Sequence, residues 1–296
     1  SDVQAIKSDV QSLNTKVTRL LATNAALNAA SVSGHVVVTP EAQNAVVEGS
    51  QSTWTWVHHE NRLFAVGCVH CGLYYRTVAP LGLVFVSLPK AVVDRKVVAV
   101  FFAAPIEGFP MACLPTNLDI MAVEVSETNV ASAASWPCAA PALPQVYGCV
   151  FGHSNSSIVS GEGGVVGCQM TPPSGIFVET AGEKRQSGTL LYGTAVDGGD
   201  STLLGVYCGV VDPRSTMKPR GRLALFPALE TMSCYVPAPV AAGTEVGVND
   251  SSGARAITVV AGGVADTCGP FPGVFVAAAP MCSYSGSFDC GSCRAR

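Results

Sequence analysis

The first thirty residues place an apolar side chain at alternating intervals of three and four positions. The series runs through Val3, Ile6, Val10, Leu13, Val17, Leu20, Asn24 and Leu27, and Asn24 is its one polar member. This is a heptad repeat with Val or Asn at position a and Ile or Leu at position d. The pattern predicts an amphipathic helix over residues 1–30 with a narrow apolar seam.

Such a seam favours packing of the helix on the same helix in other copies, as in a parallel coiled coil. Asn24 at an a position is typical of coils that fix register and strand number. Val at a with Leu at d favours a dimer, whereas Leu21 at an e position widens the seam and suits three strands. We expect a homotrimer, with a dimer as the alternative. A single amphipathic helix packed on its own domain is the other interpretation.

From residue 31 onward the pattern changes to short apolar runs separated by Gly, Pro, Asn or Asp. The runs cover residues 35–38, 53–57, 63–69, 81–88, 97–102, 120–125, 146–151, 189–192, 203–211, 223–226, 256–260 and 273–277. Short runs with turn residues between them are typical of strands in a sandwich or barrel. We therefore predict a mainly β chain: a coiled-coil stalk over 1–30, then a β-sandwich or β-barrel head over 31–296. A shift to Ala, Ser and Pro near 132–144 marks a possible sub-boundary.

Composition narrows the function classes. Charged residues make up 13% of the chain, about half the usual share, and the net charge is −4 with no run of Lys or Arg. A nucleic-acid binder normally has a basic face, so we expect no nucleic-acid partner. The chain has no uninterrupted stretch of 18 or more apolar residues, so the sequence predicts no membrane span. Neither a phosphate-binding loop nor a dinucleotide fingerprint occurs, and we expect no cofactor.

Twelve cysteines, an even number, are spread along the chain. They are consistent either with disulfides or with free thiols that act as small buried residues, since most lie within strand-like apolar runs. A zinc site is a further hypothesis. Cys68, His70 and Cys71, together with Cys290 and Cys293, supply the thiolates and imidazole that zinc prefers. Such a site requires that the two groups meet in space, which spacing alone does not establish.

Three residues stand in the order of a serine-protease triad. His70 ends a strand-like run, Asp119 opens the run Asp-Ile-Met-Ala-Val, and Ser201 closes Gly-Gly-Asp-Ser. In such a triad the serine attacks, the histidine carries the proton and the aspartate orients the histidine. The backbone N–H groups of Gly199 and Ser201 are candidates for an oxyanion hole. The order and spacing resemble trypsin and the viral 3C-like proteases, which implies an endopeptidase that processes a viral polyprotein. Thr202 stands where that family has glycine.

The stalk and the β-rich remainder together resemble the trimeric attachment fibres of reoviruses (orthoreovirus and aquareovirus). The resemblance rests on residues 3–27 and on the strand-and-turn composition of 35–296. It implies an outer-capsid protein on the virion surface, assembled in the host cytoplasm, whose head binds a host-cell surface protein or glycan. A parallel coil would hold several heads at one end, so that weak contacts reinforce one another. We take this as the leading interpretation and the protease as the alternative.

Overall fold

We describe the chain from a computed structural model. The described residues are 2–32, 36–37, 52–72, 74–77, 82–106, 116–127, 135–138, 145–152, 158–160, 164–166, 176–178, 186–195, 202–211, 220–250, 253–266 and 269–279. Strands dominate these ranges, with one long helix at the N-terminus, so the prediction of a mainly β chain is confirmed. Within the described residues no helix is both long enough and apolar enough to cross a membrane.

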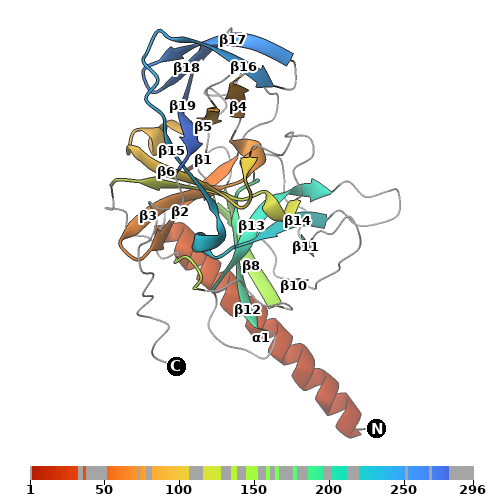
Figure 1. Cartoon of the computed structure of the whole chain (residues 1–296). Helices are drawn as coiled ribbons and strands as arrows, with labels where there is room; N and C mark the ends of the chain where they lie inside the picture. The colour runs from red at the N-terminus through yellow and green to blue at the C-terminus, as the bar shows by residue number, and fades with distance from the viewer. Residues whose placement is uncertain are drawn as a thin grey trace.

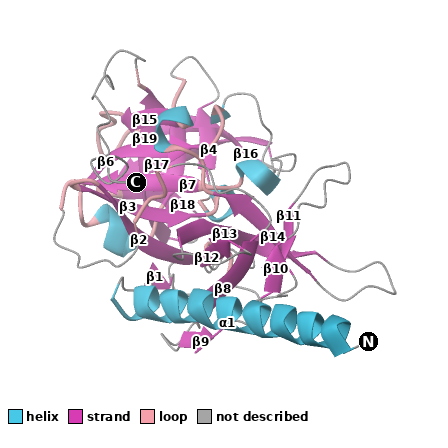
Figure 2. Cartoon of the chain, turned by 90° about the horizontal axis from the view of Figure 1, so that it is seen from below, coloured by secondary structure: helices cyan, strands magenta, loops and turns pink. Residues whose placement is uncertain are grey.

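Helix α1 (Asp2–Val32) contains the whole predicted heptad series. It lies along strands β8 (Gln145–Gly152) and β12 (Leu190–Ala195) of its own chain, as Figure 2 shows, and its N-terminal end projects beyond the strands. Thr18, on the side of the helix away from the seam, is buried. The helix is therefore packed on its own domain, as the single-helix interpretation expected.

The apolar seam of α1 nevertheless faces solvent. Its members from the first three heptads, and Leu21 beside them, are 47–69% exposed: Val3, Ile6, Val10, Leu13, Val17 and Leu20. Asn24 and Leu27 lie in the helix, and their side chains are outside the described set. Contact with the sheet thus leaves the predicted coiled-coil surface uncovered in a single copy.

The larger sheet has twelve strands in the order β1-β2-β3-β7-β6-β15-β19-β18-β17-β16-β4-β5, and every pairing in it is antiparallel (Figure 1). Its first part contains β1 (Val36–Val37), β2 (Thr53–His59), β3 (Arg62–Gly67), β4 (Tyr74–Thr77), β5 (Val84–Ser87), β6 (Val97–Phe102) and β7 (Met121–Val125). Its second part contains β15 (Ser233–Pro237), β16 (Glu245–Asp250), β17 (Gly253–Val260), β18 (Gly263–Asp266) and β19 (Gly269–Ala278). Strands β1–β7 and strands β15–β19, which come before and after the middle of the chain, thus build one sheet.

The far half of this sheet closes on itself. Strand β19 pairs with β18 through its first residues and with β5 through Gly273 to Val276. Because β5 pairs with β4, β4 with β16, and β16 with β17 and so back to β18, six strands form a ring. A separate apolar cluster, which includes Phe85, Val248 and Phe275, fills it.

The smaller sheet has seven strands and comes from the middle of the chain. Its path is β10-β8-β12-β13-β14-β11, and β9 pairs with β8. The strands introduced here are β9 (Ile158–Ser160), β10 (Gly164–Val166), β11 (Ile176–Val178), β13 (Thr202–Val211) and β14 (Arg220–Leu225). The two ends of the path, β10 and β11, lie next to each other.

The two sheets pack face to face on a shared core. Phe64 and Phe101 of the larger sheet lie in one cluster with Leu203 and Val206 of β13. Trp136 lies between the sheets and contacts Phe64 and, edge-on, Phe226 at ring-centroid distances of 5.5 and 5.0 Å. Its indole Nε1–H donates to the carbonyl of Pro227 at 3.0 Å. The chemistry described next lies at this junction between the sheets.

The other helices within the described ranges are single turns: α2 (Lys90–Val93), η2 (Val69–Cys71), η5 (Thr116–Leu118) and η6 (Leu229–Thr231). Of these, η2 contains His70 and Cys71 of the candidate site, and η5 ends immediately before Asp119.

Candidate functional site

His70 is placed by a tight turn at the end of β3. The strand ends at Gly67, where the Trp54 ring lies so close that a Cβ would come within 2.8 Å of it, so a side chain there would displace the ring. The chain then enters η2, in which the backbone N–H groups of Cys71 and Gly72 donate to the carbonyl of Cys68 at 3.2 and 3.3 Å. This turn carries the His70 side chain to the edge of the core between the sheets.

Asp119 comes from the segment between η5 and β7 and holds His70 at two points. Its Oδ2 lies 2.5 Å from His70 Nδ1, and its Oδ1 accepts from the backbone N–H of His70 at 3.0 Å. Two contacts from one carboxylate fix both the position and the rotation of the imidazole. Because the carboxylate binds Nδ1, it favours the tautomer that carries its proton there and leaves Nε2 as the acceptor.

The two side chains differ in their access to solvent. The Asp119 side chain is 9% exposed, whereas that of His70 is 41% exposed. A buried carboxylate behind a partly exposed imidazole is the arrangement in which a histidine can exchange protons with a substrate while its orienting group stays out of water.

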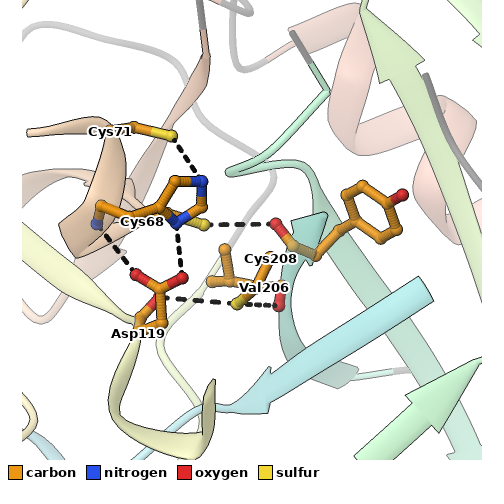
Figure 3. A network of polar contacts seen from close by, with 7 residues as sticks. Cys68, Cys71, Asp119, Val206 and Cys208 are labelled. Atoms are coloured by element: carbon orange, nitrogen blue, oxygen red, sulfur yellow. Dashed lines mark hydrogen bonds and ion pairs between the residues drawn. The ribbon is translucent and has the colours of Figure 1, made fainter. Parts of the chain in front are cut away.

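Cys71 lies on the other side of the ring. Its Sγ is 3.2 Å from His70 Nε2 (Figure 3). Burial lowers the pKa of His70, but hydrogen bonds with Asp119 and then Cys71 outweigh burial and raise that pKa above its ordinary 6.5. The side-chain contact with Cys68, followed by that with His70, lowers the pKa of Cys71 to about 6 against the opposing effect of burial. Cys71 therefore lies against the ring nitrogen that Asp119 leaves as the acceptor.

Two more thiols lie beside this pair (Figure 3). Cys68 is fully buried and its Sγ donates to the carbonyl of Tyr207 at 3.2 Å. Cys208 donates to the carbonyls of Val206 and Asp119 at 3.3 and 3.5 Å. Burial raises the pKa of both thiols. Strand β13 is thereby joined both to the turn that carries His70 and to the segment that carries Asp119.

The structure brings together His70 and Asp119 of the predicted triad. Ser201 and Gly199 lie outside the described residues. Thr202, the residue after Ser201, is exposed and begins β13. Strand β13 also supplies Tyr207 and Cys208 to the site.

Of the predicted zinc ligands, Cys68, His70 and Cys71 lie together, with their ligand atoms within 4.8 Å of one another. Cys290 and Cys293 lie outside the described residues. Sequence analysis did not select Cys208, which joins Cys68 and Asp119 in a second group of the same size. A signal for it was present: Val206 and Cys208 are two residues apart in a strand, which places both on the face that packs against the larger sheet.

Scans against models of known protein families and against curated proteins find no match. Solved structures similar to this chain include three proteases. One is a thermostable serine protease, AL20, from an extremophilic microorganism (TM-score 0.37, 12% identity, 60% of this chain and 85% of that chain). A second is the active form of the Rv3671c protease from M. tuberculosis (0.37, 13%, 70% and 81%). A third is an HtrA-type protease, AlgW, with a decapeptide (0.35, 11%, 68% and 63%). Similarities at this level assign the chain to no family.

Proposed function

We propose that the chain is a serine endopeptidase in which His70 is the general base, Asp119 orients it and Ser201 is the nucleophile. The observation that carries the proposal is the double contact of the Asp119 carboxylate with His70, at Nδ1 and at the backbone N–H. A buried carboxylate that binds both the ring Nδ1 and the backbone N–H of a partly exposed histidine has little use in a purely structural turn. It is what a base needs in order to keep one ring nitrogen available.

The chemistry follows from that arrangement. With a proton on Nδ1, the lone pair of Nε2 accepts the Ser201 proton as the hydroxyl oxygen attacks a peptide carbonyl. The imidazolium that forms is stabilised by Asp119 and then gives its proton to the leaving amine. Cys71 is 5% exposed, so its thiol is poorly placed to meet a peptide, which favours Ser201 as the nucleophile. The N–H groups of Gly199 and Ser201 are the proposed oxyanion hole.

A fluorophosphonate probe, which reacts with activated serine hydroxyls, tests the proposal directly. We expect about one label per chain, with the labelled peptide containing Ser201, and no label on the Ser201→Ala variant. Ser187→Ala serves as a matched control and should label like the parent. An unlabelled parent chain, or a label that persists in Ser201→Ala, would remove the serine peptidase from consideration.

The exposed seam of α1 supports a second proposal, that the helix joins copies of this chain. Six apolar residues at heptad positions are each about half exposed or more. Apolar stripes of this length are rarely left in water, and the heptad spacing makes the stripe complementary to itself. Attachment to a host-cell receptor through a trimer, expected from the fibre resemblance, would require this association first.

Changing Leu13 to aspartate tests the association. Leu13 is 61% exposed in one copy, so the charge should leave the fold of the monomer intact and disrupt only a packed seam. We expect the molar mass from light scattering to be that of a multimer for the parent chain, with a trimer favoured over a dimer. For the variant we expect the mass of a monomer. Ser8→Asp, on the opposite side of the helix, should remain a multimer. A monomeric parent chain at high concentration would contradict the proposal.

A further inference from the structure

We propose that Cys68, His70 and Cys71 form a binding site for a thiophilic divalent cation such as Zn²⁺. Cys68 and Cys71 are spaced as Cys-x-x-Cys, the spacing of common zinc-binding turns, and both sulfurs lie within 4.8 Å of each other and of a His70 ring nitrogen. The cation would be held through the two thiolates and Nε2 of His70. This set differs from the one that sequence suggested, because it needs no residue from the C-terminus.

The distances fit a tetrahedral ion after small adjustments. Bonds of about 2.3 Å to sulfur and 2.0 Å to nitrogen separate neighbouring ligand atoms by roughly 3.5–3.8 Å. Cys71 Sγ and His70 Nε2 are 3.2 Å apart, so the ion would enter by pushing them slightly outward. The η2 turn, which brings Cys71 back over the carbonyl of Cys68, already places both thiols on one side.

The surroundings supply the second layer that metal sites require. A metal-bound histidine usually donates its other ring N–H to a carboxylate, which sets the tautomer and the ring orientation. Asp119 does this for His70 at 2.5 Å from Nδ1, and it leaves Nε2 directed at Cys71. The same contact that orients a catalytic base therefore orients a metal ligand.

Access and selectivity also follow from the structure. Cys68 and Cys71 are buried, while the partly exposed His70 provides an opening to solvent. Sulfur ligands select soft or borderline cations over Mg²⁺ or Ca²⁺. Cys208, close to Cys68, provides one more thiol next to the site. Each thiol that binds the cation releases its proton to solvent.

A consequence follows if the proposed function is correct, since this step rests on it. Nε2 of His70 has one lone pair, and a bound cation would occupy the pair that accepts the Ser201 proton. The cation would then be an inhibitor: the enzyme would be inactive when loaded and active after the metal is removed. The binding and its effect on catalysis can be measured separately.

Cobalt(II) provides a spectroscopic test of binding that needs no enzymatic activity. Added to the full, reduced chain, Co²⁺ should give thiolate-to-cobalt absorption that saturates at one ion per chain and disappears when Zn²⁺ is added. His70→Gln, at a partly exposed position, should weaken binding at least about 100-fold, and Asp119→Asn should weaken it roughly 10- to 100-fold. Cys138→Ser, at an exposed cysteine outside the site, should bind as the parent does.

Absence of the thiolate band in the parent chain, or equal affinity in His70→Gln, would overturn the metal site. A circular-dichroism melt of each variant confirms that it is folded. In a second arm, peptide cleavage is followed with a chelator and then with excess Zn²⁺, and loss of cleavage is expected. Unchanged cleavage with the metal bound would overturn the inhibitory role alone. A chain that binds cobalt but cleaves no peptide even after the chelator has removed the metal would refute the proposed function and leave the site intact.

Discussion

Replacing Asp119 with asparagine should lower kcat for peptide cleavage by about 10⁴-fold. Asparagine has nearly the same shape, but its amide N–H₂ would face Nδ1 of His70, where the carboxylate now lies at 2.5 Å. The ring would then carry its proton on Nε2 and could not accept one from Ser201. Steady-state kinetics on a fluorogenic peptide, with the melting temperature as a check on folding, measure the effect.

Asp94→Asn is the matched control for this change. Asp94 caps the C-terminal end of α2, where its exposed carboxylate pairs with Lys90, and the substitution should leave kcat unchanged. The Asp119 variant has a second readout, because the hydrogen bond that the His70 ring donates to Asp119 raises the pKa of His70. NMR titration should show that this pKa falls in Asp119→Asn. Retention of more than a tenth of the parent kcat would mean that Asp119 does not orient the base.

The largest effect on stability is expected at Trp136. Its side chain is 3% exposed and lies between the two sheets, in contact with Phe64 and Phe226. Trp136→Ala should lower the free energy of unfolding by about 3–5 kcal/mol, through lost burial and the cavity left behind. It also leaves the carbonyl of Pro227 without its indole donor. Urea denaturation followed by circular dichroism measures the change.

Trp136→Phe separates the two contributions. Phenylalanine keeps an aromatic ring between the sheets but cannot donate to Pro227, so its loss should be clearly smaller than that of alanine. A loss below about 1 kcal/mol for Trp136→Ala would contradict the packing described here, because large buried side chains cost more than that to remove.

How far the sequence predicts this structure depends on how local each signal is. The heptads lie in contiguous residues, and the expected helix is found at Asp2–Val32. The apolar run at 203–211 likewise appears as β13, Thr202–Val211. Strands β9, β10 and β11 have three residues each, too few to show an alternating pattern, and they were not predicted. Nor does any local pattern show that α1 lies along β8.

The same distinction applies to the candidate site: residues with a local sequence signal were predicted, and residues placed by contacts between the sheets were missed. His70 and Asp119 were selected from their order and neighbours, and the structure brings them together. Cys208 was missed because it reaches Cys68 only when the two sheets pack together. The two segments are far apart in sequence: Cys68 and Tyr207, the neighbour of Cys208, are separated by 139 residues. Trp136 was missed for a related reason: it lies in a stretch rich in Ala, Ser and Pro that composition marks as a boundary, while its burial comes from both sheets.

The ring formed by β4, β5 and β16–β19 has a consequence for biosynthesis. Strand β5 leaves the ribosome nearly two hundred residues before its partner: the cross-strand pair Ser87 and Gly273 must wait for the second residue to be made. Strand β6 waits similarly for β15. Contacts so distant along the chain slow folding and leave open strand edges exposed to other nascent chains. Chaperones that shield β-edges during translation should therefore increase the yield of native protein.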